Sequence, residues 1–565
     1  MPALMRLSRP LLLILLLIFA LLWFLPLDYR KLVKSDEGRY AEIPREMLVT
    51  GDWLTPRLNG IKYFEKPPLQ YWATAATYSV FGESEWTSRL WPALTGFLGV
   101  LFTIWASAIL WGRRLPRAAL YSGLILGSSV LYVLIGHVDT LDMGTSFFLA
   151  SAVFAFTLAQ RDEAGPRSRR NWMWAAWALL AFAMLSKGLI AVVLPGATLV
   201  LYSLWQRDLT LWKRLHLVSG LALFLLISAP WFIAVSLKNP EFARFFFIHE
   251  HFERFLTKTH HRYQPMWFFI PILLAGILPW LIALFGGLVT GLRREMTQRF
   301  QPTRFLLVWC ALVFAFFSVS DSKLIGYILP IFPALAALMG YHLAKIGVSA
   351  PRSLRWHALS FVVLGVLTIA LAPQVLRSAT NEVPAALYQA FVPWIIAAGA
   401  ALALGGLYAW LQASRSNADR AMLGLAFGGL LFNQIAISGS ETLAPANSGY
   451  NIAQAIRPYV TPDVPFYSVG MYEQTLQPYL RRTTQMVAYA DELEFGISVE
   501  PDKFIPTVDA FEQRWRATNG QAFALMAPSM YQQLRQHGLP MYLLAQDTRR
   551  VVVTRQAIAN QAVVK

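Results

Sequence analysis

The chain has 565 residues, of which 56% are hydrophobic and only 14% are charged. A soluble protein of this size would carry about a quarter charged residues, and the repeated apolar runs are long enough to cross a bilayer, which indicates a polytopic membrane protein. The net charge of +17 does not indicate nucleic-acid binding, because the Lys and Arg residues lie in short clusters between apolar runs. The single cysteine, Cys310, excludes an intrachain disulfide.

The chain begins with two arginines, Arg6 and Arg9, followed by an apolar run that extends to Phe24. This resembles a signal peptide, but no small-x-small cleavage site follows the run. We therefore expect an uncleaved first transmembrane helix.

Windowed hydrophobicity predicts about thirteen transmembrane helices. Their expected starts lie near residues 10, 90, 118, 141, 172, 189, 217, 267, 305, 324, 358, 392 and 420. Three apolar stretches are too long for one helix, and each should be a helical hairpin with a polar turn. The stretches are 118–160, broken by His137, Asp139 and Asp142; 172–205, broken by Lys187; and 305–341, broken by Asp321 and Lys323.

Alternation of these helices across the membrane places every short Arg-rich loop on one side, which is therefore cytoplasmic. The opposite side receives the long first loop, all three polar turns, a later loop and the C-terminal segment. These segments are residues 28–89, the turns at 136–142, 187 and 320–323, the loop 236–266, and everything after residue 438. The uncommon polar residues should therefore all face one non-cytoplasmic compartment.

The first loop contains two predicted helical segments. Ile43, Met47 and Leu48 recur at near-helical spacing among charged residues, which predicts an amphipathic helix lying on the membrane surface. After Pro67 and Pro68, the more apolar segment 69–81 should be a second interfacial helix.

Composition changes after residue 437, which divides the chain into an all-α transmembrane domain, 1–437, and a small α/β domain, 438–565. Strands are predicted over 464–469, 485–489, 522–526 and 549–554, and helices over 472–481, 510–516 and 530–537. No catalytic motif is recognisable in this second domain.

Carboxylates gather in the predicted outer segments. Asp36 and Glu37 follow the first helix, and Asp139 lies in a turn between two helices. A solvated juxtamembrane turn would explain either site by itself. However, a carboxylate close to the bilayer is costly without a partner or a role, and these acids share a small volume with Lys66 if the helices form one bundle.

Isolated cations lie on the same side: Lys66 beside Glu65, and further along the chain Lys187, Arg254 and Lys323. Snorkelling to lipid headgroups would explain each one separately. Four cations on one face nevertheless suit an anionic lipid head.

A divalent metal, Zn or Mg/Mn, is an open possibility. His249 belongs to a His-x-His pair, and Glu65 could add a third ligand. The spacing fits no zinc signature, and no phosphate-binding glycine loop or Ser-His-Asp arrangement is recognisable.

These residues suit sugar transfer from a lipid phosphate. The outer compartment lacks nucleotide sugars, whereas a polyprenyl-phosphate sugar reaches the site within the membrane. Its phosphate leaving group needs positive charge rather than a protonating acid. A hydroxyl acceptor would need a carboxylate base such as Asp36 or Asp139, whereas a phosphate acceptor is already ionised and would need only orientation.

The motifs resemble those of a known family, the bacterial aminoarabinose transferases that modify lipid A, which are distantly similar to protein O-mannosyltransferases. The motifs that carry the resemblance are residues 35–40, 51–60, 63–68, 185–188 and 320–330. The resemblance implies a GT-C glycosyltransferase fold, undecaprenyl-phosphate aminoarabinose as donor, and lipid A phosphate as acceptor. It also implies resistance to polymyxin and cationic peptides, with the site and the terminal domain on the periplasmic side of a Gram-negative inner membrane.

The resemblance also implies roles for individual residues. Asp36 and Asp139 would be catalytic. Donor phosphate and lipid would contact Lys66, Arg254, Lys187, Tyr327 and Lys323. The cavity would be lined by Glu37, Arg39, Tyr40 and Tyr63, and a metal would be flanked by Glu65 and His249.

Two alternatives stay open. A lipid-linked sugar transferase similar to the protein O-mannosyltransferases would use another acceptor. A lipid or sugar transporter would show inverted repeats and charges at mid-membrane, whereas this chain shows no repeat between its halves and carries its polar residues at one face.

Overall fold

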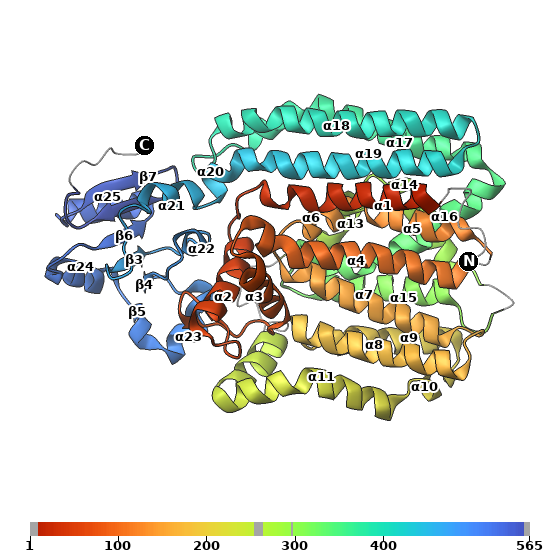
Figure 1. Ribbon diagram of the computed structural model, residues 1–565, viewed down its shortest axis with the longest axis horizontal. Coiled ribbons are helices and arrows are strands. Elements are labelled where there is room, and N and C mark those ends of the chain that lie inside the picture. Colours follow the sequence, from red (N-terminus) through yellow and green to blue (C-terminus); the bar gives the residue numbers. More distant parts are fainter. Residues whose placement is uncertain (1–8, 113, 254–263, 295–297, 559–565) are drawn as a thin grey trace.

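The computed structural model describes residues 9–112, 114–253, 264–294 and 298–558. Long helices with roughly parallel axes form a bundle, and a smaller α/β domain lies at one end of it (Figure 1). The ends of the bundle differ, because the first loop lies beside the α/β domain whereas the short helix α10 (Thr210–Lys213) lies at the opposite end.

Nine helical segments in the described part of the chain are long and apolar enough to cross a membrane. They contain α1 (Arg9–Phe24), α4 (Glu85–Trp111), α7 (Leu141–Gln160), α11 (Leu217–Lys238), α15 (Pro302–Val319), α16 (Phe332–Ser349), α17 (Leu354–Leu371), α18 (Ala385–Ser414) and α19 (Ala418–Gly439). Such a set indicates a multi-pass membrane protein.

Two bent helix pairs raise the number of spans to as many as 11. They are α5 (Pro116–Leu126) with α6 (Val130–Gly136), bent by 62°, and the segment Met266–Gly276, which contains α13 (Phe269–Gly276), with α14 (Leu281–Leu292), bent by 114°. The remaining expected helices, α8 (Pro166–Lys187) and α9 (Ile190–Gln206), do not meet the same criteria. A helix begins near every expected start, but the count of thirteen spans is not confirmed.

The three expected hairpin turns are confirmed, because helices end and restart at 137–140, at 188–189 and at 320–324. The sequence did not predict the two bends, which pair with each other. The Val130 amide donates to the Leu278 carbonyl over 3.0 Å, and the Trp280 indole donates to the Ser128 hydroxyl over 2.9 Å. At a bend, backbone groups lose their hydrogen-bond partners within the helix, and inside a membrane bundle they need other partners such as these.

The first loop contains α2 (Asp36–Thr50), the hairpin β1 (Arg57–Leu58) and β2 (Ile61–Lys62), and α3 (Leu69–Phe81). Both helices were expected, but α2 does not lie on the membrane surface as an exposed amphipathic helix. Its residues from Glu37 to Met47 are all buried. The physical reason is that the terminal domain covers the polar face, and Arg45 pairs inside the helix with Glu42 over 2.5 Å.

The terminal domain is built on a six-stranded sheet of order β5-β4-β3-β6-β8-β7. The strands are β3 (Phe466–Val469), β4 (Gln485–Val487), β5 (Phe504–Ile505), β6 (Phe523–Met526), β7 (Tyr542–Gln546) and β8 (Val551–Thr554). The first four in spatial order are parallel, and β8 and β7 continue the sheet antiparallel. The four expected strands are present, and β5 and β7 were not predicted.

Helices cover both faces of this sheet because successive strand side chains alternate between its faces. Along β3, Tyr467 and Val469 pack in one core cluster, whereas Phe466 packs in another. The helices are α21 (Tyr450–Ile456), α22 (Leu476–Leu480), α23 (Glu494–Val499), α24 (Val508–Ala517) and α25 (Pro528–Gln536). The short segment α20 (Ala444–Asn447) connects the bundle to this domain.

Direct bonds join the terminal domain to the first loop. Asn59 and Thr484 exchange two hydrogen bonds of 2.7 Å, from the Asn59 amide to the Thr484 carbonyl and from the Thr484 backbone to the Asn59 side chain. Arg57 pairs with Glu500 at 3.0 Å. The end of the bundle, the first loop and the terminal domain therefore form one continuous body.

Candidate active site

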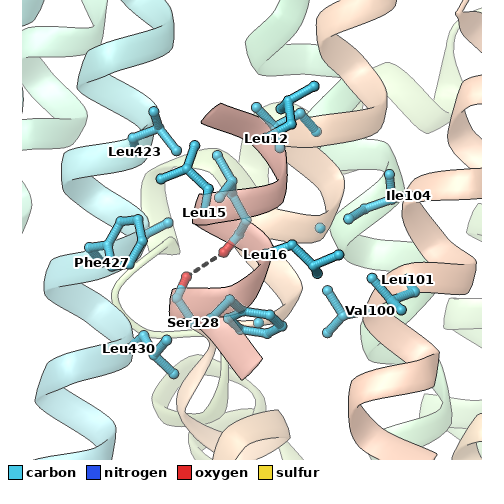
Figure 2. A pocket seen from close by; sticks show the side chains of 16 residues that line it. Leu12, Leu15, Leu16, Val100, Leu101, Ile104, Ser128, Leu423, Phe427 and Leu430 are labelled. Carbon is cyan, nitrogen blue, oxygen red and sulfur yellow. Dashed lines mark hydrogen bonds between the residues drawn. The ribbon is translucent and has the colours of Figure 1, made fainter. Parts of the chain in front are cut away.

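Two regions of the structure are candidates for the functional site. A cavity of about 310 Å³ lies between α1, α4, α5 and α19, and Figure 2 shows that leucines, Val100, Ile104 and Phe427 line it. Its Ser128 hydroxyl donates to the Leu124 carbonyl over 2.6 Å. This lining offers no group for acid–base or phosphate chemistry, so the candidate site lies elsewhere, at the seam between the first loop and the terminal domain.

Asp36 is the first residue of α2 and remains accessible. Its side chain is 46% exposed, and Arg39, one turn later, approaches it to 3.5 Å. A carboxylate in the first turn interacts favourably with the positive end of the helix dipole. The start of the helix thus presents an accessible carboxyl group at the end of the bundle.

Glu37, the next residue, points in the opposite direction. Its carboxylate accepts two bonds from Arg89, of 2.7 and 2.8 Å, and others from the Val33 and Asp139 amides. Burial by itself would raise the pKa of Glu37, but the Arg89 guanidinium outweighs it and holds the pKa at about 2. Glu37 therefore anchors α2 to α4, and it does not line an open cavity as the sequence suggested.

Asp139 is fully buried behind the same network. One carboxylate oxygen accepts from the Gln70 amide over 2.7 Å, and the other has no hydrogen-bond partner in the described part of the chain. Burial, and then the charge of Glu37, raise the pKa of Asp139 well above its usual value. This buried acid thus differs from Asp36, whose side chain is 46% exposed.

Arg39 is the centre of an aromatic cluster. Its guanidinium lies 5.7 Å from the Tyr40 ring centre and 5.9 Å from that of Tyr63. Tyr40 in turn stacks on Tyr71, with ring centres 6.1 Å apart. Arg39 also forms an ion pair with Glu492 of the terminal domain. Arg39, Tyr40 and Tyr63 thus lie together, and their role in lining a substrate cavity stays a prediction.

Three buried phenols in this region are potential donors to a ligand. The hydroxyls of Tyr63, Tyr71 and Tyr472 have no hydrogen-bond partner among the residues that the structure describes. Burial raises the pKa of each phenol, so all three keep their protons. Buried polar groups without a partner are uncommon in folded proteins, and a hydroxylated ligand would satisfy them.

Two of the expected cations lie beside aromatic or acidic groups. The Lys66 ammonium donates to the Glu65 carbonyl over 2.7 Å and lies 3.9 Å from the Glu65 carboxylate. Lys187 forms an ion pair with Asp142 and lies 4.7 Å from the Tyr327 ring centre. The structure therefore brings Lys187 and Tyr327 together from distant parts of the chain.

Lys323 is engaged by the backbone, and its expected contact with donor phosphate stays a prediction. Its ammonium is buried and donates to two backbone carbonyls, those of Gln264 and Ser320. Two of the three N–H donors of this ammonium thereby stabilise the turn after α15, which leaves one for a phosphate. Arg254, the other expected phosphate ligand, lies outside the described residues.

The suggested metal ligands do not form a complete set. His249 lies in a π-helical segment, Arg244–Glu253, and stacks on Phe245 with ring centres 5.2 Å apart. Within the described ranges, no three His, Cys, Asp or Glu side chains are placed to hold a metal ion. Glu65 and His249 as metal ligands stay a prediction, and no chemical step below depends on a metal.

The sequence analysis missed several residues of this region. Arg89 could have been noticed as a lone cation near a helix start, and Gln70 as a polar residue two positions after Pro68. By contrast, no sequence signal connects Tyr472, Gln474 or Glu492 with the first loop. These three belong to the terminal domain, where we recognised no catalytic motif.

Two family models match the chain. A model described as dolichyl-phosphate-mannose-protein mannosyltransferase matches residues 10–246, and one described as aminoarabinose transferase C-terminal domain matches residues 452–555. An undecaprenyl phosphate-alpha-4-amino-4-deoxy-L-arabinose arabinosyl transferase from Erwinia tasmaniensis is 34% identical over 354 residues, which is 62% of each chain. The chain thus spans about three fifths of the length of the curated relatives it matches.

Solved structures extend the match over nearly the whole chain. The crystal structure of ArnT from Cupriavidus metallidurans bound to undecaprenyl phosphate is 40% identical, with a TM-score of 0.91 over 97% of this chain and 99% of that one. The Archaeoglobus fulgidus oligosaccharyltransferase, with a TM-score of 0.51 and 11% identity, shares the fold alone. With the bundle, the first loop and the terminal domain all matched, this chain belongs to the ArnT family of aminoarabinose transferases and has the GT-C fold.

Proposed function

We propose that this protein transfers 4-amino-4-deoxy-L-arabinose from undecaprenyl phosphate to a phosphate of lipid A. The reaction would take place at the periplasmic face of the Gram-negative inner membrane. The observation that carries the proposal is the cluster at the end of the bundle, where the half-exposed Asp36 lies beside Arg39 and its tyrosines. The names of the relatives favour this donor.

The phosphate of the donor leaves without a protonating acid, so positive charge must be placed where negative charge develops. Lys66 and Lys187 supply it from the first loop and from the end of α8, and Arg254 is proposed to join them. Tyr327 holds the Lys187 ammonium over its ring face. In a single displacement, an acceptor oxygen bonds to the anomeric carbon while the bond from that carbon to the phosphate oxygen breaks, which inverts the configuration.

The two acids would have different roles. Positive charge develops on the sugar in such transition states, and the Asp36 carboxylate stabilises it. The ionised phosphate of lipid A needs orientation rather than a base, and Arg39 relieves its repulsion from the nearby acids. Asp139, buried and bonded to Gln70, supports the site from behind. The Tyr63 and Tyr71 hydroxyls donate to the sugar.

Charge distribution favours the proposed sidedness. The Arg-rich turn between α7 and α8 and the region of α10 belong to the end of the bundle opposite the terminal domain (Figure 1). Arg-rich short loops stay in the cytoplasm, so the terminal domain and Asp36 are expected in the periplasm.

The test is reconstitution of the purified protein with undecaprenyl-phosphate aminoarabinose and lipid A, followed by mass spectrometry of the lipid A. The wild type should add one aminoarabinosyl unit. Asp36→Asn should add none, whereas Asp509→Asn, which removes an exposed acid at the start of α24 far from the site, should match the wild type. Equal activity of Asp36→Asn and the wild type would refute the role of Asp36, and no product from the wild type would refute the function.

A second candidate function keeps the lipid-linked donor and changes the acceptor. The match of residues 10–246 to the protein mannosyltransferase model favours it. Presenting lipid A and an unstructured serine- and threonine-rich peptide in the same reaction separates the two, because only one of them should gain the sugar.

A further inference from the structure

One guanidinium is shared between acids of two domains. Arg39 forms an ion pair with Glu492, whose side chain is 8% exposed, and lies 3.5 Å from Asp36, whose side chain is 46% exposed. Glu492 belongs to the short helical turn Asp491–Leu493 of the terminal domain, whereas Asp36 begins α2. An acid of the terminal domain therefore competes with Asp36 for the same cation.

Glu492 is fixed in position by its own domain. The Gln474 side chain donates to it over 3.0 Å. The backbone of Gln474 packs directly on α2, because a Cβ added to Gly38 would lie 2.5 Å from the Gln474 carbonyl carbon. The loop that carries Gln474 is thus held against the turn of α2 that carries Arg39.

We propose that Glu492 is a positioning residue of the transfer reaction. It holds the Arg39 guanidinium between the Tyr40 and Tyr63 rings, and it thereby prevents Arg39 from closing a tight ion pair with Asp36. The inference rests on the proposed function, in which Asp36 faces the sugar. The terminal domain accordingly belongs to the active site and is not only an appended module.

The physical reason is that a buried guanidinium requires a counter-ion. Without the Glu492 charge, Arg39 turns to the nearest alternative acid, Asp36, and draws it away from the substrate. Small displacements of a reacting group reduce turnover strongly, so Glu492→Gln should lower kcat by roughly 10- to 100-fold. KM for the donor should stay within about twofold, because other cations bind its phosphate.

A matched control separates positioning from docking of the domain. Glu500 also joins the terminal domain to the first loop, through Arg57 at 3.0 Å and the Lys62 amide at 3.0 Å, but it does not contact the first turn of α2. Glu500→Gln should leave kcat within about twofold of the wild type. Equal losses in Glu492→Gln and Glu500→Gln would show that Glu492 acts only through docking, and would overturn the proposal.

A double variant tests the competition directly. When Arg39→Gln is the background, no guanidinium is left to capture Asp36, so adding Glu492→Gln should cost less than about twofold in kcat. A full loss in this background would mean that Glu492 acts independently of Arg39.

A measurement without substrate keeps this inference separate from the proposed function. Carbodiimide labelling of carboxylates, read by peptide mass spectrometry, should modify Asp36 in the wild type, with the fully buried Glu37 as an unlabelled reference. Labelling of Asp36 should fall severalfold in Glu492→Gln and stay unchanged in Glu500→Gln. Unchanged labelling in Glu492→Gln would overturn the positioning role, whereas a wild type that labels but transfers no sugar would refute only the proposed function.

Discussion

The buried pair Glu37–Arg89 offers a quantitative test of how the first loop is attached to the bundle. Both side chains are fully buried, and two hydrogen bonds join them. The pKa of Glu37 falls from 4.5 to about 2, and each step of one in pKa corresponds to about 1.4 kcal/mol. The ionised pair therefore contributes about 3 kcal/mol to the free energy of unfolding at neutral pH.

Glu37→Gln should remove about this amount, because glutamine keeps the shape but leaves the Arg89 charge buried without its main counter-ion. A carboxyl with a lowered folded pKa contributes stability above its unfolded pKa, here 4.5, and loses that contribution as pH falls towards 2. The difference between wild type and variant should thus shrink from about 3 kcal/mol at about pH 7 to about 1.4 kcal/mol at about pH 3.

Denaturant unfolding in detergent at the two pH values measures this difference, with Asp509→Asn as a control at an exposed acid. The control should lie within about 0.5 kcal/mol of the wild type. A loss below about 0.5 kcal/mol in Glu37→Gln at neutral pH, or an equal loss at both pH values, would refute the assigned charge state of Glu37.

Three further outcomes are expected. Asp139→Asn should keep more of the transfer activity than Asp139→Ala, because asparagine retains a side-chain oxygen that can accept from the Gln70 amide. Equal activities of the two variants in a lipid A mass assay would contradict this. Gly38→Ala should weaken the docking of the terminal domain on α2, because the added Cβ would lie 2.5 Å from the Gln474 backbone. Gly196→Ala should not, because its Cβ would meet no atom within 4 Å. Limited proteolysis between the bundle and the terminal domain measures the difference. Lys66→Met should weaken binding of undecaprenyl phosphate at least tenfold, whereas Lys323→Met should weaken it less than about threefold, because the Lys323 ammonium donates to backbone carbonyls. Calorimetric titration with undecaprenyl phosphate measures both affinities. Equal losses would show that Lys323 also binds the phosphate.

Several features of this protein follow from local sequence alone. Lys187 interrupts an apolar run, and a charge in mid-membrane is so costly that the helix must end there, as it does. The same reasoning predicted the turn that carries Asp139. The charges of Asp36 and Lys66 in the first loop, together with the family motifs around them, likewise predicted that this loop is the reactive part of the chain, and this stays a prediction.

Other features depended on tertiary contacts. The hydrophobic pattern of α2 has the same appearance whether lipid, water or another domain covers its polar face, so only the structure could show that Glu37 is an anchor buried against Arg89. Local pattern also could not distinguish Lys187, which pairs with Asp142, from Lys323, which caps a turn.

The sequence by itself determined the approximate helix starts and the three polar turns, because a charged or polar residue in hydrocarbon is costly wherever it lies in the chain. It did not determine the two bends, where no charge interrupts the apolar run. The tertiary structure decided which charges meet, because Arg39 and Glu492 lie at opposite ends of the chain and become neighbours only when the terminal domain docks on α2. Ion pairs form between charges that are close in space, and the order of residues along the chain does not give that distance.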